Sequence, residues 1–338
     1  NIKAAQFGYE AVAGVTFKPA WQWQLKAPRG RLIDGAQALA FGALAADCRF
    51  SAFYPMSPAT NIIQSLIDWG SGLPLVVEQA EDEIAAVNMV IGAAFAGARA
   101  ITATSGGGFA LMTEGLGLAA MTETPIVIVD AQRPGPATGL PTRTAQADLQ
   151  FVIHAAQDEF PRFVFAPGTP YESYQAATRA LELSHRFQVP SIILVDQYLA
   201  DSIFVAEEFF GVPESISTYT IDDTDLDKAV SYQRYALTET GVSPRALPCQ
   251  GRALVKACSD EHDEEGHITE DADMRDAMIT KRFDKLEAMR RKIRPPGTIH
   301  ADADTLLVCW GSLQGAMQEA VLLLRAAGHD CGGVHFMD

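Results

Sequence analysis

The alternation of short apolar runs with longer alanine-rich stretches between Leu32 and about Ser202 constrains the fold of this chain more than any other feature. The short runs, such as TPIVIVDA and PSIILVDQ, are rich in β-branched residues and are typical of buried strands. The longer stretches have the length and composition of helices. Regular strand–helix alternation predicts an α/β domain with a doubly wound, mostly parallel sheet.

One predicted helix, between Glu83 and Ala98, is apolar on nearly every side. A helix without a polar face is normally covered by other parts of a protein. We therefore expect this helix to be buried, either inside the domain or in an interface between subunits.

The strand–helix pattern stops between about Ile203 and His300, where the chain is polar, acidic and contains prolines. This segment ends in a mixed-charge helical stretch, MRDAMITKRFDKLEAMRRKI, which is closed by Pro295 and Pro296. A new strand–helix–strand pattern begins at Thr305 and predicts the start of a second α/β domain. The expected parts are an upstream tail at 1–30, the first α/β domain at 31–202, an acidic linker with a helix at 203–300, and the start of the second domain at 301–338.

Net charge and hydropathy exclude several classes of partner. The 338 residues include 26 Lys and Arg against 42 Asp and Glu, so the net charge is −16 with neutral histidines. This excess of negative charge repels nucleic acids and anionic bilayers, so we expect neither as a partner. The sequence also lacks the roughly 18 uninterrupted apolar residues of a membrane-spanning helix.

The five cysteines are odd in number, scattered along the sequence and contain no C-x-x-C pair. This usage predicts reduced thiols, a cytoplasmic location, and a chain that holds no iron–sulfur cluster by itself. The sequence starts without a methionine or a signal peptide and stops just after a predicted strand. We interpret it as an internal piece of a longer polypeptide.

Four unusual loops follow predicted strands. They are YPMSPAT at 54–60, EQAEDE at 78–83, TSGGGF at 104–109 and DAQRPGPATG at 130–139. The carboxyl ends of parallel strands meet at one edge of a sheet, where the next helices point their N-termini into a shared crevice. The sequence therefore predicts a ligand site at this edge.

These loops resemble those of the α subunit of 2-oxoacid:ferredoxin oxidoreductases. The resemblance rests on Y-P-M-S-P, on E-D-E before a helix, and on T-S-G-G-G-F and V-D-A-Q-R-P-G-P-A-T-G. Residues 32–200 are similar to the family's pyrimidine-binding domain of the thiamine diphosphate fold. DEHDEEGHITED also matches, WGSLQGAMQEAVLLLRAAG resembles the family's transketolase C-terminal-like domain, and residues 1–30 resemble the tail of a fused γ domain. Ser57 departs from the Thr of many members, and Cys249 departs from the usual Gly.

The resemblance implies an enzyme that converts a 2-oxo acid, CoA and oxidised ferredoxin into an acyl-CoA, CO2 and reduced ferredoxin. The fused tail and the acidic segment favour 2-oxoglutarate, with pyruvate and other 2-oxo acids as alternatives. Thiamine diphosphate would lie at the interface with a β subunit that holds Mg²⁺ and a 4Fe–4S cluster, in an (αβ)2 hetero-oligomer. Two further functions stay open: a thiamine-dependent decarboxylase or transketolase-like enzyme without electron transfer, and a non-catalytic scaffold subunit.

Glu83 is the candidate catalytic residue. Its position before a helix also fits a carboxylate that only stabilises the helix N-terminus through the helix dipole. When positions are counted back from Gly92 and Gly97, the family's thiamine-activating Glu falls at Glu83. That carboxylate would contact N1′ of the aminopyrimidine and favour the imino tautomer, which removes the thiazolium C2 proton.

Arg133 and Ser57 are the candidate substrate-binding residues. An Arg guanidinium matches the two oxygens of a carboxylate, and in the family the corresponding Arg and hydroxyl contact the 2-oxo acid. The alternatives from the residues alone are a solvated loop charge for Arg133 and a turn-forming role for Ser57 between two prolines.

Four other residues are candidate cofactor contacts by the same resemblance: Tyr54 and Pro55 in one loop, and Ser105 and Gly106 in another. The glycines after Ser105 would suit either a phosphate cradle or a tight turn that lets backbone approach a ligand. Because no G-x-G-x-x-G or G-K-[ST] motif is present, we favour the tight turn near the thiamine pyrimidine.

The acidic run DEHDEEGH raises the possibility of a metal site at His262, Asp263 and His267. A run of charges without ligand spacing is more typical of a solvated loop, so we interpret it as such and expect no metal site in this chain.

Overall fold

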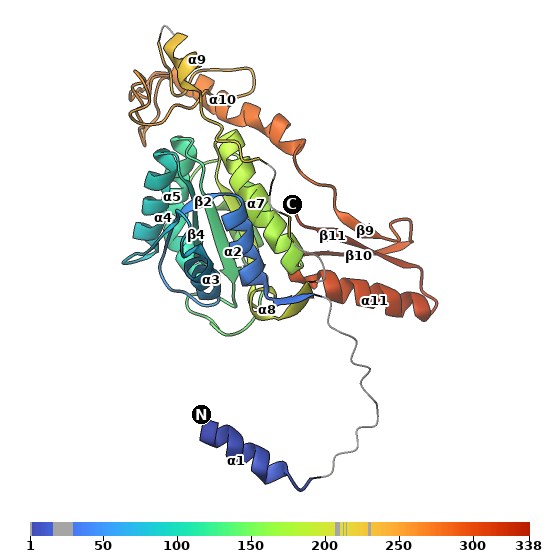
Figure 1. The fold of residues 1–338 in the computed structure, drawn as a ribbon. Helices are drawn as coiled ribbons and strands as arrows, with labels where there is room; N and C mark the ends of the chain where they lie inside the picture. Colours follow the sequence, from blue (N-terminus) through green and yellow to red (C-terminus); the bar gives the residue numbers. More distant parts are fainter. Residues whose placement is uncertain (1, 16–29, 207–209, 212, 214, 229–230) are drawn as a thin grey trace.

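A six-stranded parallel sheet forms the centre of the computed structural model, which describes residues 2–15, 30–206, 210–211, 213, 215–228 and 231–338 (Figure 1). The strand order is β3-β2-β4-β5-β7-β6. The bounds are β2 Cys48–Phe53, β3 Val76–Gln79, β4 Arg99–Thr104, β5 Val127–Gln132, β6 Phe163–Phe165 and β7 Ser191–Asp196. Every residue of β4, β5 and β7 is buried, as is typical of the central strands of a parallel sheet covered on both faces.

Helices cover both faces of this sheet, so the domain has two hydrophobic cores (Figure 1). One core lies under α2 (Gly35–Ala45), α3 (Thr60–Gly70) and α7 (Pro170–Phe187), and the other lies under α4 (Glu83–Phe95) and α5 (Gly106–Met121). Successive β5 residues alternate between the two cores. The predicted doubly wound α/β fold is confirmed.

The first helix of the sheet domain begins later than its apolar sequence suggests. Leu32 and Ile33 lie in β1 (Arg31–Ile33), which pairs antiparallel with β8 (Phe204–Ala206). Asp34 then caps α2, because its carboxylate accepts the Gln37 N–H at 2.6 Å and its own N–H donates to the Gln37 side chain.

The polar segment after β8 folds back onto the sheet domain through α10 (Ala272–Arg290), while α9 (Asp223–Lys228) is short. Two lysines of α10 reach the buried carboxylate of Glu123, with Nζ–O distances of 2.5 Å for Lys281 and 2.6 Å for Lys285. Burial alone would raise the pKa of Glu123, but Lys285, Lys281 and Arg234 outweigh it and hold that pKa well below the ordinary value.

A second, smaller sheet follows, with the order β10-β11-β9. Its elements are β9 Gly297–Ile299, β10 Thr305–Trp310, the short turn η1 Gly311–Leu313, α11 Gln314–Ala326 and β11 Cys331–Phe336. Strands β10 and β11 are parallel, as expected for a strand–helix–strand unit. At the other end of the chain, α1 (Ile2–Val12) is exposed at every residue. The described helices include none that is long and apolar enough to cross a membrane.

Candidate functional site

The candidate site lies at the point where the order of the parallel strands reverses. Strand β2 has β3 on one side and β4 on the other, so the connections after β2 and β4 diverge. Doubly wound sheets open a ligand crevice at the carboxyl edge of such a point. The loops beginning at Tyr54 and Ser105 start from this edge, and α4 begins beside it.

Glu83 is the first residue of α4 and is only 3% exposed. The helix is capped by the preceding residue, because the Asp82 carboxylate accepts the Ala85 N–H at 2.7 Å. The Oε1 atom of Glu83 has no hydrogen-bond partner among the described residues. A buried polar atom without a partner costs about 1–3 kcal/mol, so a merely cap-stabilising role leaves this burial unexplained.

The first turn of α5 provides the space for this carboxylate. A Cβ atom at Gly108 would overlap Thr104 Oγ1 and would lie 2.6 Å from Glu83 Oε1. Glycine at this position therefore allows Thr104 and Glu83 to approach the same point of the helix. Thr104 therefore belongs to this site, although it was not identified as a site residue from the sequence.

Arg133 follows β5 and connects two of the loops. Its Nη1 donates to the carbonyl oxygen of Ser57 at 2.8 Å, and its Nε has no partner among the described residues. The arginine is 9% exposed, so it is not the solvated loop charge of the alternative interpretation. Ser57 itself is exposed, and the contact runs through its backbone and not through its hydroxyl.

The other candidate cofactor contacts divide into exposed and buried residues. Tyr54 is 39% exposed, and Pro55 is also exposed. Ser105 is fully buried, and although it precedes α5, its hydroxyl caps no backbone N–H and has no partner in the described part of the chain. Gly106 lies half-buried in the next position. The edge thus collects unpartnered polar atoms of Glu83, Ser105 and Arg133, which suits a polar ligand.

Two aspartates near this edge were given no role by the sequence reasoning. Asp130 lies in β5 directly opposite Thr104, and its two buried oxygens accept a hydrogen bond from no donor group among the described residues. Asp148 precedes α6 (Leu149–His154), and its buried Oδ2 atom also has no hydrogen-bond donor among the described residues. The motif V-D-A-Q-R contains Asp130, whereas the loop around Asp148 carries no recognisable pattern.

The acidic run DEHDEEGH does not form a metal centre in the described residues, which contain no group of three His, Cys, Asp or Glu placed to hold an ion. It is also less solvated than predicted. The Glu261 carboxylate pairs with Arg275 and Arg282 of α10, both at 2.8 Å. His262 is fully buried, with its ring centroid 4.1 Å from that of Tyr235. The ion pairs of Glu261 attach the run to α10, and the buried ring of His262 packs against Tyr235.

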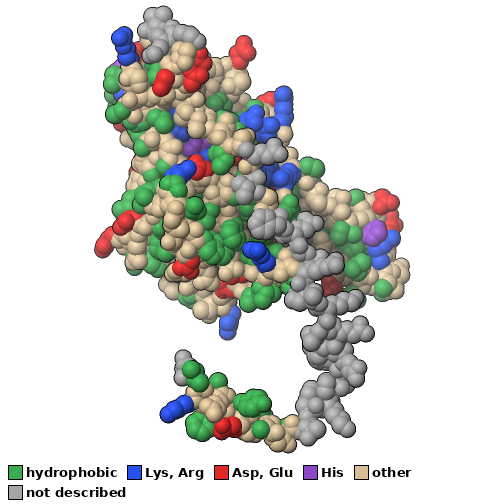
Figure 2. Space-filling view, in the orientation of Figure 1, with side chains coloured by type: hydrophobic (Ala, Val, Ile, Leu, Met, Phe, Trp, Pro, Cys, Tyr) green, Lys and Arg blue, Asp and Glu red, His purple; other side chains and the backbone are tan. Residues whose placement is uncertain are grey.

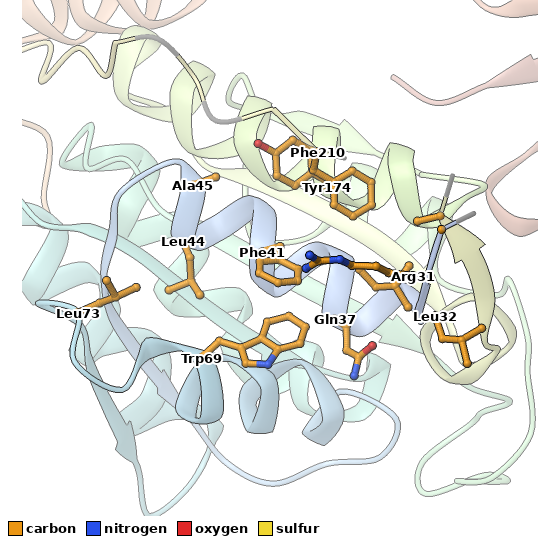
Figure 3. Close-up of a pocket in the computed structure, with 13 residues that line it drawn as sticks. Arg31, Leu32, Gln37, Phe41, Leu44, Ala45, Trp69, Leu73, Tyr174 and Phe210 are labelled. Atoms are coloured by element: carbon orange, nitrogen blue, oxygen red, sulfur yellow. The ribbon is translucent and has the colours of Figure 1, made fainter. Parts of the chain in front are cut away.

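A large cavity lies elsewhere, between β1, α2, α3 and α7 (Figure 3). It has a volume of about 600 Å³, and the side chains of Phe41, Trp69 and Tyr174 give it an apolar lining. None of the candidate site residues lines it. Because the unpartnered polar atoms gather at the carboxyl edge of the sheet, we assign the candidate site there and not to this cavity.

Residues 41–281 match the family described as pyruvate flavodoxin/ferredoxin oxidoreductase, thiamine diphosphate-binding. The chain belongs to this family of thiamine-binding domains. It is similar to subunit alpha of 2-oxoacid:ferredoxin oxidoreductase 1 of Sulfurisphaera tokodaii, with 41% identity over 85% of this chain and 48% of that protein. It is also similar to the 2-oxoglutarate synthase subunit KorA of Methanocaldococcus jannaschii, with 30% identity over 90% of this chain and 81% of that protein.

A solved structure agrees with these relatives. The 2-oxoglutarate:ferredoxin oxidoreductase from Magnetococcus marinus, with 2-oxoglutarate, coenzyme A and succinyl-CoA bound, superposes with a TM-score of 0.87 at 31% identity. The match covers 99% of this chain and 58% of that one. The chain spans about half the length of several curated α subunits that it matches.

Proposed function

We propose that the chain is the thiamine-binding part of the α subunit of a 2-oxoacid:ferredoxin oxidoreductase. The complete enzyme would convert a 2-oxo acid, CoA and oxidised ferredoxin into an acyl-CoA, CO2 and reduced ferredoxin. The observation that carries this proposal is the buried, unpartnered carboxylate of Glu83 at the strand-order reversal of a thiamine-family domain. A group of this kind suits a ligand that brings its own hydrogen-bond donor.

Held against Glu83 and the loops after β2 and β4, thiamine diphosphate would supply a carbon nucleophile and an electron sink for decarboxylation. Glu83 would hold a proton between its Oε1 and N1′ of the aminopyrimidine, which favours the imino tautomer. Ser105, Tyr54, Pro55 and Gly106 would bound the pyrimidine pocket. In this proposal, the chain contributes the Glu83 carboxylate and the surrounding loops to the activation of thiamine.

Arg133 would bind the carboxylate of the 2-oxo acid. Its Nη1 is engaged by the Ser57 carbonyl, which fixes the side chain, while Nε and the remaining N–H groups can face a substrate. Ser57 would contribute its exposed hydroxyl. The names of the KorA relative and of the Magnetococcus structure favour 2-oxoglutarate among the possible 2-oxo acids.

A β subunit would complete the site, with the diphosphate grip, Mg²⁺ and a 4Fe–4S cluster on its side and an (αβ)2 assembly overall. The apolar side chains Ile84, Met89 and Leu111 support this, because they are exposed on α4 and α5 next to the site. Figure 2 shows hydrophobic side chains at the surface on the side where these helices lie. The described residues thus cover only one face of α4, the helix that was expected to be buried. All five cysteines are unbridged, which suits a cytoplasmic enzyme.

Expression of the chain with and without a candidate β subunit tests the proposal. We expect the chain alone to bind thiamine diphosphate poorly, and the complex to contain thiamine, iron and sulfide and to reduce ferredoxin or viologen only with both CoA and a 2-oxo acid. Decarboxylation without CoA-dependent electron transfer would favour the non-redox enzyme. An assembled but inert complex would favour the scaffold subunit.

A further inference from the structure

Two carboxyl groups without an assigned role lie directly behind the turn at Ser105. Asp130 is fully buried in β5, in register with Thr104 at the end of β4. Asp148 approaches from the start of α6 and contacts Asp130 through its side chain. The pair therefore adjoins the first turn of α5, where a Cβ atom at Gly108 would lie 2.6 Å from Glu83 Oε1.

Asp148 is oriented towards this turn and not towards its own helix. It occupies the N-cap position of α6, yet its carboxylate accepts no backbone N–H there. Its own N–H donates to Gln132 Oε1 at 3.1 Å, which anchors it to the end of β5. A Cβ atom at Gly106 would lie 2.6 Å from Asp148 Oδ2. The carboxyl is thus packed against the backbone of the α5 turn.

A single proton explains how two carboxyls tolerate this proximity. Two ionised carboxylates cannot hydrogen bond to each other, because neither has a proton to donate. Both oxygens of Asp130 and Oδ2 of Asp148 have no other partner among the described residues. One shared proton converts the repulsion into an O–H···O⁻ hydrogen bond. Burial, followed by the charge of Asp148, raises the pKa of Asp130 well above its ordinary value.

The polar groups on the neighbouring strands are already engaged in other contacts, so they do not compete for this proton. Asp196 on the adjacent β7 is already engaged, since its carboxylate accepts the Leu199 N–H at 2.9 Å and the Ser312 hydroxyl. On β4, the Thr104 hydroxyl contacts the Met56 sulfur and the Ser105 carbonyl.

We propose that Asp130 and Asp148 share one proton and act as positioning residues that hold the Ser105–Gly108 turn against Glu83. Loss of the proton would place two charges behind Gly106 and push the turn towards the cofactor pocket. This inference rests on the proposed function for its cofactor readout. The expected consequence is that cofactor affinity falls as the pH rises and the pair loses its proton.

The shared proton is measured first, without any cofactor. Infrared spectra of the co-expressed αβ complex at mildly alkaline pH should contain the C=O stretching band of a protonated carboxylic acid. The band should disappear in both Asp130→Asn and Asp148→Asn, because the amide then donates to the remaining carboxylate. Absence of the band from the wild-type complex would overturn the proposal.

Cofactor binding is measured next, by calorimetric titration of the apo complex with thiamine diphosphate between neutral and alkaline pH. We expect Asp148→Ala to bind about 10-fold or more weakly, because it removes a hydrogen bond to a charged group. Asp148→Asn should restore most of this affinity and should lose the alkaline decline of the wild type. A wild-type pH profile in Asp148→Asn, or unchanged affinity in a folded Asp148→Ala complex, would contradict the positioning role.

Hydrogen exchange keeps this test separate from the proposed function. If the wild-type complex binds no thiamine diphosphate, the proposed function fails, but the infrared band and the exchange of residues 105–109 still decide the inference. We expect Asp148→Ala to lose amide protection in this turn and Asp148→Asn to keep it. Equal protection in all three proteins would show that the pair does not hold the turn.

Discussion

Glu83 and Glu123 are both buried carboxylates, with exposed fractions of 3% and 1%, yet their surroundings differ completely. Glu123 pairs with Lys281 and Lys285 and stabilises a junction between α5 and α10. Glu83 has an unpartnered oxygen at the open edge of the sheet. A buried carboxylate whose oxygens all have partners stabilises the fold. A buried carboxylate with an unpartnered oxygen marks a place where a ligand can supply the missing hydrogen bond.

Substitution of Glu83 by Gln should separate activity from stability most clearly. We expect turnover of the assembled enzyme to fall by about 10² to 10⁴, the usual range for a positioned acid–base group. Stability should be unchanged or slightly higher, because an unpaired buried charge is removed. Steady-state assays and denaturant unfolding check both points.

Glu81→Gln is the matched control, since Glu81 is exposed two residues earlier. It should leave turnover near that of the wild type. Wild-type turnover in Glu83→Gln would mean that the activating carboxylate is a different residue.

Substitution of Glu123 by Gln should have the opposite effect. It leaves two buried ammonium groups without their counter-ion, so we expect a loss of about 3–5 kcal/mol in the free energy of unfolding. The exposed pair of Glu287 and Arg291 is the control, because Glu287→Gln should cost less than about 1 kcal/mol. Equal unfolding midpoints for the two variants would refute the structural role of Glu123.

Acid pH should affect stability through the same carboxylate. The folded-state pKa of Glu123 lies below its ordinary value of 4.5, so the unfolded chain takes up the proton first as the pH falls. Its contribution to stability is therefore complete above about pH 4.5 and is lost progressively below it. Urea unfolding at a series of pH values should show a shallower acid decline in Glu123→Gln than in the wild type.

Arg133→Ala tests the substrate side of the open site. We expect the KM for the 2-oxo acid to rise about 10- to 150-fold, the effect of losing a hydrogen bond to a charged group worth about 1.5–3 kcal/mol. Arg133→Lys should recover part of it, and Ser57→Ala should have a smaller effect. If the KM for CoA rises instead, Arg133 belongs to the CoA site.

Asp82→Ala should lower the free energy of unfolding by about 1 kcal/mol, less than Glu123→Gln, because it removes the cap of α4. Asp82→Asn keeps a side-chain oxygen and should be close to neutral. Thermal unfolding of both variants measures the difference. A larger loss of turnover than in Glu83→Gln would mean that Asp82, and not Glu83, acts on the cofactor.

Much of the fold was accessible from sequence because its signals are local. Short apolar runs predicted β5 and β7, and the loops after the strands predicted the edge of the sheet that carries Glu83, Ser105 and Arg133. Strand β1 pairs with β8, which is far away in the sequence, and no local sequence pattern predicts this pairing. Similarly, the mixed charges of α10 gave no sign that Lys281 and Lys285 are buried, because that burial depends on the distant Glu123.

The site shows the same division. Glu83 and Ser105 lie in or next to segments whose motifs resemble a known family, and that resemblance identified them. Asp148 lies in an irregular loop, and its importance appears only when the fold brings it beside Asp130 and Gly106.

The close approach at Gly108 also offers a simple diagnostic for other sequences of this kind. Even one added methyl group there would collide with Thr104 and crowd Glu83. A homologue with any side chain at this position would have to rearrange both residues. An alanine in place of the third glycine of the S-G-G-G turn, the position of Gly108, would therefore mark a paralogue that has kept the architecture and lost the chemistry.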